Sequence, residues 1–261
     1  MTSIEGKRVL VVGASSGVGR AFAIQAIKSG ADVVVSARRS DRLNELLTGV
    51  AIGDSGAGNA PRAIAGDIRI AEDRQRIVEV AIEHLGAIDL LFYAVGYAPL
   101  RHLVEMTDDE WRNVFETNVI GLQQLLASLV TMFAPGGIAA VLSSETAGKA
   151  RHSLGAYGAS KAALTESLRA WQLEHPEMRF SCIALGETQP TEFADAFDHR
   201  ALGPVVATWL RHGLMQRESM ATDDVARLLV DLFASALAFP GIGIEQIVLR
   251  SPSAVVGSDG S

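Results

Sequence analysis

Tyr157 and Lys161 stand four positions apart in the segment Tyr157-Gly-Ala-Ser-Lys161, inside a stretch with helical periodicity. Side chains at that spacing project from the same face of a helix. A phenol has a pKa of about 10 in water and is a poor acid or base at neutral pH, but a nearby ammonium group favours the phenolate. The pair therefore predicts a site where Tyr157 exchanges a proton and Lys161 lowers the pKa of the phenol.

Two further polar residues fit the same chemistry. Ser144 lies thirteen positions before Tyr157, at the carboxyl end of a predicted strand, where open parallel sheets place their ligands. Its hydroxyl is expected to hold the oxygen of a substrate; Ser143 is the alternative, but the spacing to Tyr157 favours Ser144. Asn118 falls in a predicted helix, where Asn has no propensity advantage, and is expected to anchor a water. Each residue alone has an ordinary structural explanation, whereas the four in this order indicate an active site.

A glycine-rich turn, Gly13-Ala-Ser-Ser-Gly17-Val-Gly19, connects a predicted strand to a predicted helix. Gly13 permits the tight turn, Gly17 lets the backbone approach a pyrophosphate, and Gly19 allows close packing of the helix. The helix N-terminus offers free N–H groups to an anion, and the serines of the turn add hydroxyl donors. The context predicts a dinucleotide-binding turn. Its predicted contacts are Gly13, Ser15, Ser16, Gly17, Val18 and Gly19.

The second predicted strand ends in Ser36-Ala37-Arg38-Arg39. Proteins that bind NAD place an acidic residue about here to hold the ribose hydroxyls. A carboxylate would repel the 2′-phosphate of NADP(H), whereas Arg38 and Arg39 offer charge-assisted and often bidentate contacts. The arginines therefore predict NADP(H) in preference to NAD(H). The alternative is that they are solvated charges at a strand end.

The elements that must position these residues alternate between short β-branched runs and longer helical segments, which predicts a Rossmann-type, doubly wound, seven-stranded parallel sheet with helices on both faces. The predicted strands are Arg8–Val12, Asp32–Ala37, Pro61–Ala65, Ile88–Ala94, Gly137–Ser143, Arg179–Leu185 and Ile244–Leu249. The predicted helices are Val18–Ser29, Asp41–Thr48, Ala71–Leu85, Asp108–Phe133 (expected to be two helices), Ser153–His175 and Thr222–Ala236.

No segment resembles a domain linker, so residues 1–261 are expected to form a single domain. Residues 191–219 mix aromatic and apolar side chains with glycine and proline, which predicts a small helical insertion that serves as a substrate lid. The stretch Gly49–Ala60 is expected to be a surface loop. The tail from 251 to 261 has little to pack and is expected to be mobile.

Bulk composition excludes several classes of function. Of the 261 residues, 48% are apolar, which suffices for one sizeable core. The 23 basic and 30 acidic residues give a formal charge of −7, which disfavours nucleic acid and anionic membranes as partners. The single cysteine, Cys182, excludes an internal disulfide, and the histidines show no metal spacing. With neither a signal peptide nor a transmembrane segment recognisable, a cytoplasmic location is expected.

Together these motifs resemble the classical short-chain dehydrogenase/reductase (SDR) family over nearly the whole chain. The glycine-rich turn is similar to its cofactor turn, Tyr157-Gly-Ala-Ser-Lys161 to its Tyr-x-x-x-Lys motif, and Thr-Asn118-Val to its helical Asn motif. The resemblance implies an oxidoreductase in which hydride passes between a nicotinamide and the carbonyl carbon of a small molecule, while Tyr157 exchanges a proton with the oxygen. It implies that Ser144 polarises that oxygen, Lys161 binds the nicotinamide ribose, and Asn118 holds a water in a proton relay.

Other segments match the family less completely. Gly66-Asp67-Ile68 looks like the pair that borders the adenine. The Asn-Asn-Ala-Gly segment of the family appears as Tyr93-Ala94-Val95-Gly96, without its asparagines, and its Pro-Gly appears as Leu185-Gly186. The cofactor contacts that the resemblance implies here are Asp67, Ile68, Ala94, Val95, Gly96, Gly186, and Thr188, with Thr191 as the alternative to Thr188.

The resemblance also implies a homotetramer or homodimer that pairs through the helices holding Asn118 and Tyr157. Two alternative functions stay open. The lost asparagines favour a catalytically silent NADP(H)-binding or scaffold protein, against which the intact set of four catalytic residues argues. An epimerase or dehydratase acting on a nucleotide-linked sugar would use the same Tyr and Lys, but its usual longer C-terminal substrate domain is not recognisable.

Overall fold

The computed structural model describes residues 2–51, 60–197 and 199–256. Its core is a seven-stranded sheet in the order β3-β2-β1-β4-β5-β6-β9, with every neighbouring pair parallel. The strands are β1 (Arg8–Val12), β2 (Asp32–Ala37), β3 (Arg62–Ala65), β4 (Ile88–Tyr93), β5 (Phe133–Ser144), β6 (Arg179–Leu185) and β9 (Gln246–Leu249). The strand order reverses between β1 and β4, and open α/β sheets bind their ligands at the carboxyl ends of the strands beside such a switch point.

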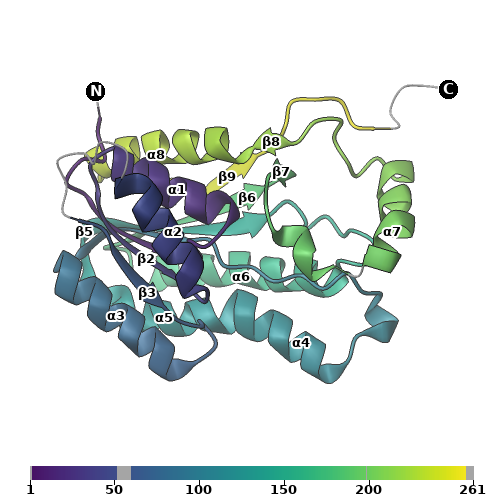
Figure 1. The fold of residues 1–261 in the computed structure, drawn as a ribbon, viewed down its shortest axis with the longest axis horizontal. Coiled ribbons are helices and arrows are strands. Elements are labelled where there is room, and N and C mark those ends of the chain that lie inside the picture. Colours follow the sequence, from purple (N-terminus) through teal and green to yellow (C-terminus); the bar gives the residue numbers. More distant parts are fainter. Residues whose placement is uncertain (1, 52–59, 198, 257–261) are drawn as a thin grey trace.

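Helices cover both faces of this sheet (Figure 1). One layer consists of α1 (Gly17–Lys28), α2 (Ser40–Ala51) and α8 (Thr222–Ala238), and the other contains α3 (Ala71–Leu85), α4 (Asp108–Phe115), α5 (Gly121–Leu129) and α6 (Gly155–Glu174). Alternate residues of each strand point to opposite faces of the sheet. Val9 and Val11 belong to the hydrophobic core on the side of α1 and α8, and Leu10 and Val12 to the core on the side of α3 and α5. The predicted doubly wound fold is confirmed.

Most predicted boundaries lie within a few residues of those observed, with two exceptions. The stretch predicted as helix from Asp108 to Phe133 contains α4 and α5 joined by a π-helical turn, Glu116–Ile120, followed by a 3₁₀ turn, Val130–Met132, and β5 already begins at Phe133. The loop predicted from Gly49 to Ala60 is wrong at its start, because α2 continues to Ala51. Residues 52–59 of that predicted loop lie outside the described residues.

The predicted helical insertion, residues 191–219, lies between β6 and α8 and contains helical turns. A short two-stranded sheet of β7 (Thr188–Gln189) and β8 (Met220–Ala221) brackets it, and it holds a 3₁₀ turn at Phe193–Ala196 and helix α7 (His199–Arg211). Another 3₁₀ turn, Leu103–Glu105, precedes α4. Figure 1 shows α7 standing beyond the end of the sheet rather than against either face.

The described part of the C-terminal tail is packed. Ser251 is buried, Val255 pairs with Gln216, and the Val256 N–H donates to the Met215 carbonyl oxygen at 2.8 Å. The expectation that the tail has little to pack is therefore wrong for residues 251–256, because the chain before β8 supplies partners. Residues 257–261 lie outside the described residues. Within the described ranges, no helix is both long and apolar enough to cross a membrane.

Candidate active site

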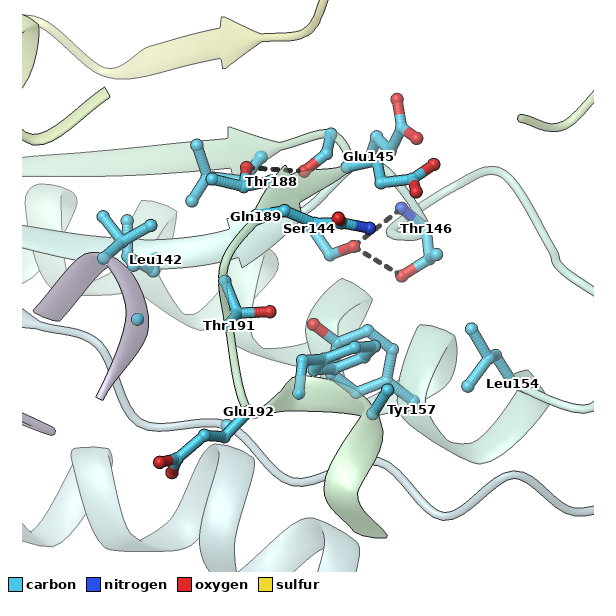
Figure 2. Close-up of a pocket in the computed structure, with 18 of the residues that line it drawn as sticks. Leu142, Ser144, Glu145, Thr146, Leu154, Tyr157, Thr188, Gln189, Thr191 and Glu192 are labelled. Atoms are coloured by element: carbon cyan, nitrogen blue, oxygen red, sulfur yellow. Dashed lines mark hydrogen bonds between the residues drawn. The ribbon is translucent and has the colours of Figure 1, made fainter. Parts of the chain in front are cut away.

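A cavity of about 680 Å³ opens where β1, β4, β5 and β6 end. It runs from the glycine-rich turn to Tyr157, and Figure 2 shows Ser144, Thr191 and Tyr157 facing it. The sequence-predicted residues that line it are Ser16, Gly17, Val18, Gly19, Ala94, Val95, Gly96, Ser144, Tyr157, Lys161, Gly186 and Thr188. The fold thus brings most of the predicted cofactor and catalytic residues to a single cavity.

Glycines are required in the turn before α1 for separate physical reasons. A Cβ on Gly13, whose φ is +95°, would stand 2.7 Å from the backbone carbon of Ala94. A Cβ on Gly19 would stand 2.3 Å from the Gly13 carbonyl oxygen. Gly17 has a φ of +53°, a left-handed conformation that favours glycine. The position that a Cβ would occupy on Gly17 faces the Thr191 side chain. The closeness of Ala94 also explains why a small residue stands there.

The N-terminus of α1 is built to receive an anion. Ser16 is its N-cap in extended conformation, and among the described residues its side chain makes no capping hydrogen bond to the helix. The first N–H groups of the helix are therefore not capped by Ser16, and Gly17 and Val18 of this turn line the cavity. This bare backbone cradle fits the pyrophosphate of a dinucleotide, which is the cofactor that the sequence predicts.

Tyr157 and Ser144 meet at the other end of the cavity. The Ser144 Oγ accepts hydrogen bonds from Thr146 Oγ1 at 2.9 Å and from Thr146 N at 3.2 Å, which fixes its orientation. Burial raises the pKa of Tyr157 to about 12, while hydrogen bonding with Ser144 and the charge of Arg151 act in the opposite direction. Ser143 instead pairs with Thr165 of α6 at 3.2 Å. Of the two serines, Ser144 is the one in contact with the phenol.

Lys161 is 2% exposed and lies one helical turn after Tyr157, with its Nζ 5.9 Å from the centre of the phenol ring. The ammonium group donates to the carbonyl oxygens of Leu142 at 2.9 Å and Val95 at 3.4 Å. Burial lowers the pKa of Lys161 to about 8. The expectation that the pKa of Tyr157 is lowered is wrong in this structure, because burial of the phenol outweighs the hydrogen bond with Ser144 and the charge of Arg151.

Asn118 is fully buried in the π-helical turn between α4 and α5. Its Oδ1 accepts from the Tyr97 N–H at 2.7 Å, and its Nδ2 donates to the Tyr97 carbonyl oxygen and to Ser160 Oγ, each at 2.8 Å. Ser160 in turn donates to the Tyr157 carbonyl oxygen. The carboxamide therefore joins the loop after β4 to helix α6, and this network holds the helix that carries the phenol.

Comparison with known proteins agrees with this geometry. The model of the short chain dehydrogenase family matches residues 7–201. The chain belongs to this family. It is an oxidoreductase of the SDR class, whose fold binds a nicotinamide cofactor and whose substrates are small molecules.

Two curated relatives illustrate the family. An uncharacterized oxidoreductase of Listeria innocua is 31% identical over 174 residues, which cover 66% of this chain and 68% of the relative. The human mitochondrial dehydrogenase/reductase SDR family member 2 is 31% identical over 206 residues, or 75% of this chain and 72% of the relative.

Solved structures share the fold at lower identity. An alcohol dehydrogenase of the archaeon Thermococcus sibiricus, complexed with 5-hydroxy-NADP, superposes with a TM-score of 0.79 at 22% identity and covers 94% of this chain and 97% of its own. A 7α-hydroxysteroid dehydrogenase complexed with NADH superposes with a TM-score of 0.80 at 21% identity, over 97% and 96% of the two chains. At these identities the similarity supports the fold alone.

The residues predicted to contact the adenosine half of the cofactor lie at neighbouring strand ends of this SDR-family chain. Arg38 and Arg39 follow β2, and Asp67 and Ile68 follow β3, which pairs with β2. Arg39 Nη2 lies 3.0 Å from Ser15 Oγ, so it adjoins the glycine-rich turn. The Asp67 carboxylate is bound by Arg69, which lowers the pKa of Asp67, and Ile68 is buried.

Two threonines follow Gly186, and the structure separates their positions. The Thr188 hydroxyl donates to the Gly186 carbonyl oxygen at 3.1 Å and is turned back on its own chain. The Thr191 side chain lies 3.5 Å from the point where a Cβ on Gly17 would stand. Gly186 itself is paired with the Leu249 carbonyl oxygen at the end of β9. Thr191 is thus the threonine that faces the glycine-rich turn.

Sequence reasoning missed two charged contacts at this site. Glu145 and Arg151 form a half-buried ion pair on the cavity wall, and Arg151 lies 6.0 Å from the centre of the Trp209 ring in α7. Glu192 pairs with Arg39 at 2.5 Å. The first pair depends on the fold of the loop between β5 and α6, and the second on where the segment after β6 returns to the sheet, so spacing alone could not have found either.

Proposed function

We propose that this SDR-family chain is an NADP(H)-dependent oxidoreductase that interconverts a carbonyl and an alcohol, with Tyr157 as the general acid and base. The observation that carries the proposal is that one cavity joins the cradle at Gly17 to a buried phenol in contact with Ser144. A bound nicotinamide supplies or accepts the hydride at the substrate carbon. The chain's own residues then have to orient the substrate oxygen and move its proton.

Each polar residue has a step in this mechanism. Ser144, oriented by Thr146, donates to the substrate oxygen and polarises the carbonyl. Tyr157 gives its phenolic proton to that oxygen as the alcohol forms, and takes it back in the reverse direction. Lys161 stabilises the phenolate that remains and holds the nicotinamide ribose. Asn118 keeps the helix of Tyr157 in register through Ser160.

The electrostatics favour carbonyl reduction at neutral pH. Because burial raises the pKa of Tyr157 to about 12, the phenol is protonated at pH 7 and is ready to donate. Alcohol oxidation needs the phenolate, so its rate is expected to rise as the pH increases. NADPH consumption measured with ketones, quinones and 3-oxoacyl thioesters tests the proposal. Tight NADPH binding without turnover of any of these would support a catalytically silent protein instead.

The substrate end of the cavity is largely apolar. Phe193, Phe197 and Trp209 from the segment after β6 line it, and the Phe193 and Tyr157 ring centres are 5.2 Å apart. We assign this segment, residues 191–219, the role of the substrate lid, because its aromatic side chains pack around Tyr157. The apolar lining favours a carbonyl compound with a hydrophobic body. The homodimer or homotetramer and the cytoplasmic location stay predictions.

Arg39 is expected to set the preference for the phosphorylated cofactor. Replacing Arg39 by glutamine should weaken NADPH binding by about tenfold to a hundredfold, because a charge-assisted contact with the 2′-phosphate is lost. NADH, which lacks that phosphate, should bind with little change. Dissociation constants from quenching of protein fluorescence measure both. An equal loss for NADPH and NADH would remove Arg39 from the 2′-phosphate site.

A further inference from the structure

The carboxylate of Glu192 contacts arginine side chains at the place where the 2′-phosphate of the proposed cofactor would bind. Glu192 Oε2 lies 2.5 Å from Arg39 Nη2, and Glu192 Oε1 lies 4.0 Å from Arg42 Nη2. Burial acts to raise the pKa of Glu192, but the hydrogen bond with Arg39, together with contributions from Ser16 and Arg42, lowers it overall. Glu192 is therefore an anion at neutral pH, seated between the end of β2 and the N-cap of α1.

The position of Glu192 follows from the path of the backbone around it. Its neighbour Thr191 faces Gly17, and on its other side Phe193 packs against the Tyr157 ring. The carboxylate itself points away from Tyr157 (Figure 2). Residues 191–193 thus run from the glycine-rich turn to the catalytic phenol, with the charge at the cofactor end. That separation argues against a role for Glu192 in proton transfer.

The Arg39–Glu192 pair is weak enough to be exchanged. The two side chains are 42% and 33% exposed, and ion pairs at such exposure are screened by water and salt. A phosphate monoester carries more charge than a carboxylate and offers more acceptor oxygens, so it binds a guanidinium more strongly. Both anions cannot occupy the same guanidinium face.

We propose that Glu192 is a specificity-determining residue that competes with the 2′-phosphate of NADP(H) for Arg39. This rests on the proposed function, because it takes NADP(H) as the cofactor. Binding of NADP(H) then requires release of Glu192, whereas NAD(H), without the 2′-phosphate, leaves the ion pair in place. Glu192 thereby lowers the advantage of NADP(H) over NAD(H) and ties loading of the phosphorylated cofactor to movement of residues 191–193.

The test compares the dissociation constants of NADPH and NADH for the full-length protein and its variants, measured by fluorescence quenching. Glu192→Gln is expected to tighten NADPH binding by about threefold to tenfold and to change NADH binding by a smaller factor. In an Arg39→Gln background, Glu192→Gln should give no gain for NADPH, since the shared partner is gone. Glu45→Gln is the matched control: it removes the same charge, and among the described residues Glu45 pairs with the exposed Arg42, at 3.3 Å, and not with Arg39.

Each outcome is decisive. The proposed competition for Arg39 would be wrong if Glu192→Gln left the NADPH affinity unchanged. It would also be wrong if the gain in affinity persisted in the Arg39→Gln background or was matched by Glu45→Gln. These outcomes would leave the proposed function intact. Loss of NADH binding in Glu192→Gln would also overturn it, since Glu192 would then hold the ribose hydroxyls. Failure of the unmodified protein to bind either dinucleotide would refute the proposed function, and this inference with it.

Discussion

A Tyr157→Phe variant is expected to fold normally and bind NADPH like the unmodified protein, yet to lose about 10²- to 10⁴-fold in turnover. The substitution removes the phenolic oxygen and keeps the ring, which is 6% exposed and packs with Leu154, Phe197 and Trp209. Ser144 keeps its two hydrogen bonds with Thr146, so the remaining site stays ordered. Turnover is measured by NADPH oxidation with a reactive ketone, folding by thermal unfolding, and NADPH binding by cofactor fluorescence.

Tyr93 provides a matched control for this loss. It is fully buried at the end of β4, and its hydroxyl has no hydrogen-bond partner among the described residues. Tyr93→Phe therefore removes the same phenolic oxygen from a different core cluster without touching the proposed chemistry, and its activity should remain close to normal. If Tyr157→Phe kept nearly full turnover, Tyr157 would have no part in proton transfer and the proposed mechanism would be wrong.

The fold could be predicted almost completely because its signals are local. The runs of β1, β2 and β6 are mostly apolar, since parallel strands are buried on both faces, and their predicted limits match the structure. The π-helical turn at Asn118 could not be foreseen, because it arises from packing between α4, α5 and the loop after β4. The packing of Ser251 likewise depends on a partner distant in sequence, because its carbonyl oxygen accepts a hydrogen bond from Gln216 Nε2.

The candidate site could be predicted in its residue types but not in its electrostatics. Spacing placed Ser144, Tyr157 and Lys161 together, because one strand end and one helical turn fix them. Spacing could not reveal how deeply the phenol is buried, and burial outweighs the opposing effects of Ser144 and Arg151, so the pKa of Tyr157 is raised to about 12. The same limit applies to Glu192, whose partner Arg39 is remote in sequence. Long-range ion pairs have no period that a sequence could reveal.

Lys161→Met is expected to lower ketone reduction about a hundredfold or more and to weaken NADPH binding. Methionine has a similar length but neither the charge nor the donors that Lys161 gives to Leu142 and Val95. Burial lowers the pKa of Lys161 to about 8, so the ammonium form is present below pH 8 and is lost as the pH rises. Since reduction uses the ammonium to stabilise the phenolate, the activity of the unmodified protein should fall above pH 8.

The shape of the pH profile separates this role from a structural one. Without an ionisable group at position 161, the residual reductase activity of Lys161→Met should lack the decline near pH 8, whereas a merely loosened site would keep that decline at lower amplitude. Lys149→Met is the control, because Lys149 is exposed and its loss alters the formal charge equally. A decline near pH 8 that persists in Lys161→Met would assign it to another group and leave Tyr157 to act without an ammonium partner.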